Sequence, residues 1–280
     1  MLLFYFFIFL FGLAVGSFLN VVIFRLENGW DIVNDRSKCM HCKHVLSWYD
    51  LFPVLSFIVL KAKCRYCKKK ISNQYPIVEI STALIFLLIF NFKFLISNEF
   101  LIFNAKFLIE LFYYFFIASA FVVIFVYDLK HYIIPDEVIY LAIVVTLVFN
   151  LYADMGIIYN ISSLDLQFVL NNSVFINHFF AAVNSFIFFF AIVFFTNGKG
   201  MGGGDVKLGF LMGLLLGWPM AFLSIFLSFI LGSVVGILLV LRKKKNMKSM
   251  IPFGPFLIIG TMAGLFWGEE IAKWYFGFIN

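Results

Sequence analysis

Long apolar segments dominate this chain, and they limit its fold more than any other feature. A segment that crosses a bilayer needs about 20 apolar residues in a helix, because backbone polar groups find no partner in hydrocarbon. Such segments recur from the N-terminus to the end of the chain. They cover residues 1–24, 77–92, 107–127, 133–153, 178–196, 206–218, 220–241 and 251–268. The pattern predicts an all-α polytopic membrane protein with about eight transmembrane helices.

The composition agrees with this fold class. The chain is 63% hydrophobic and 13% charged, whereas soluble domains are about 45–50% apolar and about 25% charged. No Lys or Arg precedes the first segment, so we interpret residues 1–24 as a retained transmembrane helix, with a cleaved secretory signal as the alternative. A polar insert at 25–76 and a seven-helix membrane domain at 77–280 follow.

Positive charge divides unevenly between the two sides of the membrane that this arrangement creates. If the N-terminus lies outside and all eight helices cross, the insert 25–76 and the basic cluster 242–248 fall inside, and the polar loop 154–177 falls outside. Three of the 21 Lys and Arg residues then lie outside, namely Lys93, Lys106 and Lys273. Because cytosolic loops carry an excess of Lys and Arg, the insert is predicted to be cytosolic. Anionic lipids suffice as partners for the net charge of +6, so we expect no nucleic-acid partner.

Two aspartates stand where predicted helices meet the cytosolic boundary of the membrane. Asp128 ends the helix predicted at 107–127, and Asp205 opens the helix predicted at 206–218. Two facing carboxyl groups share a proton, because they cannot both ionise readily. One can then take a proton from water while the other hydrogen-bonds the carbonyl oxygen of a peptide bond. The pair therefore predicts hydrolysis of a peptide bond without a metal or a covalent intermediate.

Each aspartate also has a structural interpretation. Asp205 can cap its own helix, and Asp128 can pair with a nearby lysine or lie at the headgroups. Asp136 stands at an ordinary helix start, so we interpret it as a cap and leave any further role open. The glycines before Asp205 would let a substrate backbone approach closely, although glycine-rich loops are often only turns. These substrate-approach residues are Gly202, Gly203 and Gly204.

All four cysteines lie in the predicted insert, in two C-x2-C pairs. They are Cys39, Cys42, Cys64 and Cys67. Two such pairs supply four thiolates in a tetrahedral arrangement, which suits structural Zn²⁺, and the many neighbouring Lys and Arg residues favour thiolates. A redox-active dithiol and unliganded thiols are the alternatives, although permanent disulfides are disfavoured in the cytosol. Since four cysteines fill the zinc shell, we interpret His41 and His44 as solvated.

An apolar segment at 48–60 separates the two cysteine pairs. At this length it cannot cross a bilayer. It either docks on the membrane surface or forms the core of the insert.

The ordered set of motifs resembles the bacterial type IV prepilin peptidases, which are membrane aspartyl proteases with a Gly-x-Gly-Asp motif. The resemblance runs nearly end to end. Besides the two cysteine pairs, it is carried by residues 16–22, 48–56, 75–79, 128, 134–136, 202–208 and 251–256. It implies cleavage of basic leader peptides from type IV pilins, and from pseudopilins of secretion or DNA-uptake machines, at the cytosolic face of the inner membrane. It also implies that Asp128 and Asp205 are the catalytic pair, in a protease core at about 107–241, and that the four cysteines bind zinc.

The resemblance further implies methylation of the new N-terminus with S-adenosylmethionine. Two positions depart from the family pattern: Met40 stands where a proline is common, and Gln74 where an arginine is common. Gln74 is beside the loop linked to methylation, so its departure bears on methylation more than on cleavage. No glycine fingerprint of a nucleotide-binding fold is present, and the sequence does not identify the binding site of the methyl donor.

Three other functions fit parts of the sequence. A proton-coupled transporter would carry its carboxylates near the middle of the membrane, whereas both aspartates here map to one boundary. A quinone-linked thiol oxidoreductase would need oxidised cysteine pairs, which the cytosol disfavours. A metalloprotease would need a His-Glu-x-x-His helix, which the sequence lacks. Cleavage by paired aspartates is the function that the sequence favours.

Overall fold

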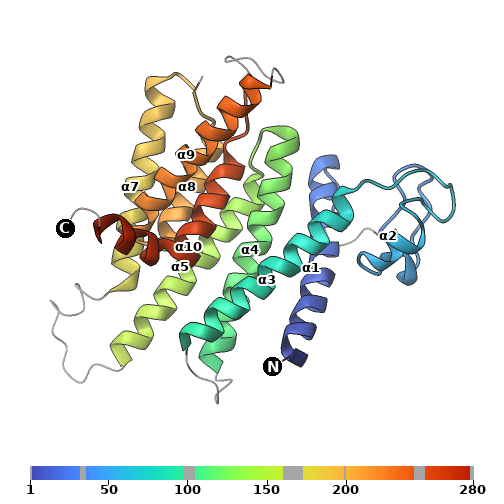
Figure 1. Ribbon diagram of the computed structural model, residues 1–280, viewed down its shortest axis with the longest axis horizontal. Helices are drawn as coiled ribbons and strands as arrows, with labels where there is room; N and C mark the ends of the chain where they lie inside the picture. The colour runs from blue at the N-terminus through green and yellow to red at the C-terminus, as the bar shows by residue number, and fades with distance from the viewer. Residues whose placement is uncertain are drawn as a thin grey trace. The chain divides into compact units, whose positions relative to one another are not determined.

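The computed structural model describes residues 2–31, 36–97, 105–159, 173–198, 200–242 and 250–277. These residues form helices and loops with two isolated β-bridges and no strand. The long helices are α1 (Leu2–Asn28), α3 (Gln74–Ser97), α4 (Ala105–His131), α5 (Asp136–Tyr159), α7 (Val174–Phe195), α8 (Gly203–Leu216), α9 (Met220–Leu241) and α10 (Gly254–Gly277) (Figure 1). The predicted all-helical fold class is confirmed, and each predicted helix is present.

Six of these helices are long and apolar enough to cross a membrane, and the chain is a multi-pass membrane protein. They are α1, α3, α4, α5, α7 and α9. Helix α8 has 14 residues, and at about 1.5 Å per residue it is shorter than the roughly 30 Å hydrocarbon core of a bilayer.

The helices on either side of the predicted loop 154–177 extend into it. Helix α5 continues to Tyr159, and α7 begins at Val174. The carboxylate of Asp154 accepts hydrogen bonds from the Ser173 hydroxyl at 2.5 Å and from the Val174 amide at 2.8 Å. A carboxylate at a helix N-terminus satisfies free amides there, so Asp154 joins the end of α5 to the start of α7. The rest of this loop, 160–172, and most of the basic cluster, 243–248, lie outside the described residues.

The chain divides into two compact units, residues 1–126 and 127–280. In the first unit, α1 packs against α3 with two glycines at the contact. A Cβ added to Gly12 would lie 2.5 Å from the Cα of Ala83, and one added to Gly16 would lie 2.6 Å from the Cα of Glu79. The two helices therefore meet backbone to backbone, as small residues allow in membrane proteins. Between α1 and α3 the chain forms the insert, with the short helices η1 (Trp48–Leu51) and α2 (Leu55–Val59).

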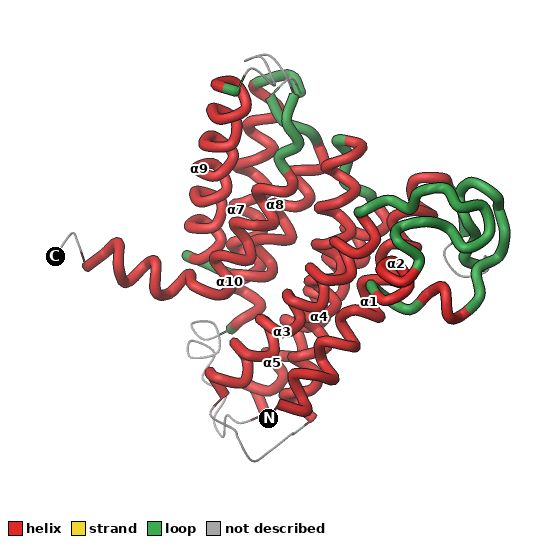
Figure 2. Tube along the Cα trace, turned by 45° about the vertical axis from the view of Figure 1, so that its right-hand side comes forward, coloured by secondary structure: helices red, strands yellow, loops and turns green. Residues whose placement is uncertain are grey.

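In the second unit, α8 is the central helix. It packs against α5, α7, α9 and α10, and Figure 2 shows it among α7, α9 and α10. Most of its residues are buried, including Leu208, Leu211 and Leu214, which have no exposed surface. A helix that is apolar on all sides is suited to a position inside a bundle. The burial of α8 brings its N-terminal residues to the ends of the neighbouring helices.

Close packing of α8 depends on its glycines. A Cβ on Gly213 would overlap backbone atoms of Ala181 and Ala182 in α7, whereas a Cβ on Gly236 in α9 would meet only the Cδ1 atom of Ile251, at 3.8 Å. Gly213 therefore marks a backbone contact between two helices, and Gly236 has room for a methyl group.

We expect Gly213→Ala to destabilise the protein by about 1–3 kcal/mol, because α7 and α8 must move apart to admit the methyl group. The same change at Gly236 should be neutral or stabilise the fold by up to about 1 kcal/mol, since alanine favours a helix. Thermal unfolding of both variants in detergent measures the difference. Equal midpoints would contradict the packing argument.

Candidate active site and metal centre

Asp128 is buried at the end of α4. Asp128 is 4% exposed. The amide of Gly254, the first residue of α10, donates a hydrogen bond to Asp128 Oδ2 at 3.1 Å. The positive end of a helix dipole therefore faces this carboxylate, and α10 holds it in place.

Asp205 is the third residue of α8 and binds the loop before its own helix. Its Oδ2 atom accepts a hydrogen bond from the Gly202 amide at 3.2 Å, and its own amide donates to the Gly202 carbonyl oxygen at 3.2 Å. Asp205 thus caps α8, as its structural interpretation predicted. The cap uses Oδ2, and among the described residues the Oδ1 atoms of Asp205 and Asp128 accept no hydrogen bond. Each carboxyl group keeps one oxygen for another partner.

Ile134 lies between Gly204, which precedes Asp205, and Gly254, which binds the Asp128 carboxylate. A Cβ on Gly204 would lie 3.0 Å from Ile134 Cβ, and a Cβ on Gly254 would lie 3.5 Å from Ile134 Cδ1. Asp205 directly follows Gly204, and Gly254 binds the Asp128 carboxylate, so both aspartates stand next to Ile134 contacts. The fold therefore brings the ends of α4, α8 and α10 together around Ile134.

The glycines at the site have different roles. The added Cβ on Gly254 would lie 2.6 Å from Asp128 Oδ2, so a side chain there would displace the carboxylate. Gly204 leaves room for Ile134. Gly202 is exposed, and the space around Gly203 is open, so these two offer the accessible backbone that the sequence predicted for all three loop glycines. Sequence analysis missed Ile134 and Gly254 as site residues, although both lie in motifs that carried the family resemblance.

Asp136 and Lys207 form an ion pair beside the aspartates. Asp136 is the first residue of α5, and its Oδ1 atom lies 2.6 Å from the ammonium nitrogen of Lys207. The same ammonium group lies 4.9 Å from the ring centroid of Tyr140. The carboxylate of Asp136 thus binds Lys207, which joins the start of α5 to the fifth residue of α8.

The four cysteines of the insert come together in space. Their sulfur atoms all lie within 4.8 Å of one another, and the Sγ atoms of Cys39 and Cys67 are 3.9 Å apart. Four thiolates at about 2.3 Å from a tetrahedral Zn²⁺ would be separated by about 3.8 Å. The donor set and its spacing therefore fit zinc. The predicted grouping of the cysteines is confirmed, and the identity of the metal stays a prediction.

Both C-x2-C pairs form the same kind of turn. The amide of Lys43 donates to the Cys39 carbonyl oxygen at 2.9 Å, and the amide of Lys68 donates to the Cys64 carbonyl oxygen at 3.0 Å. Lys43 and Lys68 both have positive φ angles, 57° and 60°. Burial raises the pKa of the Cys39 thiol, but hydrogen bonds from nearby backbone amides outweigh this effect and lower its pKa to about 7. Metal binding would displace the protons of all four thiols, because the thiolate is the form that binds a metal.

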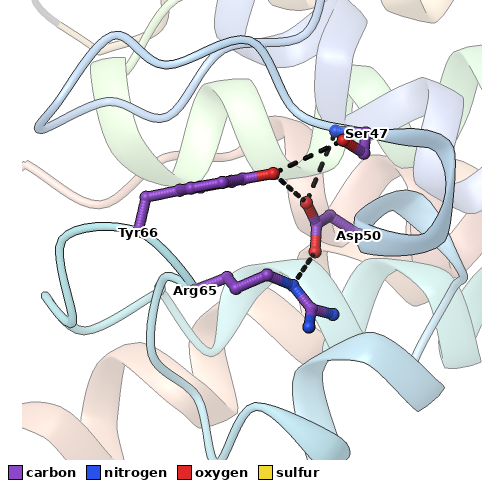
Figure 3. Close-up of polar contacts among 4 residues, drawn as sticks. All are labelled: Ser47, Asp50, Arg65 and Tyr66. Atoms are coloured by element: carbon purple, nitrogen blue, oxygen red, sulfur yellow. Dashed lines mark hydrogen bonds and ion pairs between the residues drawn. The ribbon is translucent and has the colours of Figure 1, made fainter.

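A buried carboxylate holds the second cysteine turn (Figure 3). The side chain of Asp50 is 3% exposed and accepts hydrogen bonds from Arg65 Nε at 2.7 Å and from the Tyr66 hydroxyl at 3.2 Å. Arg65 and Tyr66 stand between Cys64 and Cys67, so Asp50 ties η1 to this turn. Sequence analysis did not single out Asp50, although it is the one acidic residue among the nine Lys and Arg residues of 36–70. Both predicted solvated histidines are exposed, but the His44 ring also packs on Tyr66, with centroids 3.8 Å apart.

Family models match two regions of the chain. Residues 10–92, which include the four cysteines, match the bacterial peptidase A24 N-terminal domain. Residues 115–237, which include Asp128 and Asp205, match the type IV leader peptidase family. The chain belongs to the type IV leader peptidase family. The resemblance inferred from its motifs is confirmed.

Relatives with one shared description match this chain, two of them over most of their length and a third over a quarter of its length. A prepilin leader peptidase/N-methyltransferase of Aeromonas hydrophila is 29% identical over 96% of this chain and 92% of its own. The protein of the same description in Pseudomonas aeruginosa is 27% identical, with the same coverage. One from Myxococcus xanthus is 52% identical over 30% of this chain and 25% of its own. No solved structure matches the chain.

We expect Cys39→Ser to lose bound zinc and to lower the unfolding temperature, because a structural zinc site contributes directly to folding. The matched control is His41→Ala, which changes an exposed residue of the same turn and keeps all four thiols. Metal analysis and thermal unfolding of the purified proteins test this. If Cys39→Ser kept its zinc content and melting temperature, the metal centre would be refuted.

Proposed function

We propose that this protein cleaves the leader peptide from type IV prepilins and pseudopilins, with Asp128 and Asp205 as the catalytic pair, and then methylates the new N-terminus. Its family and the names of its full-length relatives support the reaction. The observation that carries the assignment of residues is the contact of Ile134 with Gly204 and Gly254, which gathers the two carboxyl groups in one site.

The chemistry follows from two carboxyl groups that share one proton. The ionised group takes a proton from a water molecule, and the protonated group donates its proton to the carbonyl oxygen of the scissile peptide bond. The hydroxide that forms bonds to the carbonyl carbon. When this intermediate collapses, the carbon–nitrogen bond breaks, the leaving amine takes a proton from one carboxyl group, and a hydroxyl of the intermediate returns its proton to the other. Each turnover consumes one water and needs no metal at the aspartates.

The loop before α8 is the proposed approach for the substrate. Gly202 is exposed and Gly203 is surrounded by open space, so an extended peptide can lie against their backbone. Main-chain hydrogen bonds of this kind bind a peptide without reading its side chains. This arrangement suits an enzyme that accepts several prepilins and pseudopilins.

The two further cofactors have separate roles. Cys39, Cys42, Cys64 and Cys67 would hold a structural Zn²⁺ that supports the insert. S-adenosylmethionine would supply the methyl group for the amine that cleavage releases. We place the aspartates and the insert on the cytosolic side of the bacterial inner membrane, with the N-terminus outside, because Lys and Arg are concentrated in the segments assigned to that side.

We expect Asp128→Asn and Asp205→Asn each to reduce prepilin cleavage by at least about 10²-fold, since each removes one partner in proton transfer. Asp136→Asn is the matched control: it removes a nearby carboxylate whose exposed ion pair contributes little to stability, so most activity should remain. The assay uses purified protein and a prepilin, with mass spectrometry of the new N-terminus to detect the added methyl group.

Three results would argue against the catalytic pair. Cleavage that persists in either folded asparagine variant would refute it. Loss of cleavage on chelation or thiol blockade, with no effect of the asparagine changes, would point to metal or redox chemistry. An Asp136→Asn variant as inactive as the other two would move the chemistry to a different carboxylate.

The position of Asp128 gives a second prediction. We expect Gly254→Ala to reduce kcat by about 10²-fold with the fold retained, because the added methyl group displaces the carboxylate, and a shift of about 1 Å has an effect of this size. Gly236→Ala is the control, since that methyl group meets no close neighbour. Cleavage kinetics of both variants provide the test, and a wild-type kcat in Gly254→Ala would refute the role of α10 in holding Asp128.

A further inference from the structure

The insert exposes a group of large apolar side chains. Trp48 is 73% exposed, Ile58 64% and Val59 74%. Leu51, Phe52 and Leu55 are also exposed, and the Trp48 and Phe52 rings lie 5.7 Å apart. We call these six residues, which belong to η1, α2 and the turn between them, the η1–α2 patch. An exposed apolar surface of several residues marks an interaction site in a folded protein.

The patch is not the core of the insert. Among the described residues 36–73, Cys64 is the one residue that is buried. The cysteine cluster and the contacts of Asp50 with Arg65 and Tyr66 hold the insert, rather than packed apolar side chains. The sequence left two roles open for 48–60. The role as the core of the insert is therefore excluded, and docking on the membrane surface remains.

The turn between η1 and α2 is fixed to a helix that crosses the membrane. The Val54 amide donates a hydrogen bond to Glu79 Oε2 at 2.7 Å. Glu79 lies in α3, five residues after Gln74, which is about 7.5 Å along a helix. This distance is similar to the depth of the headgroup region on one side of a bilayer, about 5–7 Å. The insert lies beside α1, another helix long enough to cross the membrane (Figures 1 and 2).

The charge around the patch favours an anionic partner. Residues 36–70 contain nine Lys and Arg residues and one acidic residue. Lys61 and Lys63 are exposed and lie two and four residues after the end of α2. Lysines near a membrane are attracted to anionic headgroups, and tryptophan prefers the interface between lipid and water. A basic leader peptide would be repelled by this surface.

We propose that the η1–α2 patch docks on the anionic lipid surface of the same membrane that α1 and α3 cross. Its apolar side chains enter the interface between headgroups and acyl chains, and the lysines that follow α2 bind the headgroups. The insert is then held at three places, by α1, by α3 and by the patch. This keeps the metal centre at the membrane surface.

Tryptophan fluorescence in nanodiscs tests this docking on the full chain. Trp48 is made the sole tryptophan by changing Trp30, Trp218, Trp267 and Trp274 to Phe, and the discs contain lipids with brominated acyl chains. We expect the brominated lipids to remove most of the Trp48 fluorescence. Phosphatidylglycerol in the discs should strengthen the quenching, and added salt should weaken it.

A matched pair of variants identifies the surface. In this background, Val59→Glu should restore most of the Trp48 fluorescence, because it places a charge in the patch. Val45→Glu makes the same change at an exposed position outside the patch and should leave the quenching unchanged. The proposal would be overturned if acrylamide in water quenched the Trp48 fluorescence and brominated lipid did not. It would also be overturned if Trp48 were protected from acrylamide only when a prepilin is added, which would make the patch a substrate site.

Discussion

Hydrocarbon offers no hydrogen-bond partner to a peptide group, and this constraint explains where the candidate site of this protein lies. Inside a bilayer the backbone must pair with itself, so free amides and carbonyl groups occur where helices end. The candidate site is assembled from such ends. Asp128 stands in the last turn of α4, Asp205 in the first turn of α8, and Gly254 and Asp136 open α10 and α5. Free amides of two helix starts bind the two carboxylates.

Glycine is the second requirement of this arrangement. Gly213 lets α8 touch the backbone of α7, and this contact sets the position of the short central helix. Gly204 and Gly254 then leave room for Ile134 and for the Asp128 carboxylate. The same absence of a side chain serves helix packing in one place and the geometry of the site in another. This is why a methyl group at Gly213 is expected to change stability, and one at Gly254 to change kcat.

The insert follows a different principle from the helices. It has almost no buried apolar residue, so its shape depends on the cysteine cluster and on Asp50. A segment of this size without a core usually needs a metal or a disulfide to fold. Its apolar side chains remain exposed on η1 and α2, where lipid can cover them. A surface that would be a liability in water is suited to a protein that stays at a membrane.

The sequence by itself determined the eight helices, the grouping of Cys39, Cys42, Cys64 and Cys67, and the positions of Asp128 and Asp205 near helix ends. Hydropathy and short spacings carry this information because it is local along the chain. The tertiary structure alone decided that Gly254, 126 residues after Asp128, binds its carboxylate, and that Asp136 pairs with Lys207. Lipid and neighbouring helices are equally apolar, so hydropathy does not indicate which helices pack together. It therefore could not reveal which helix ends, with their polar residues, meet.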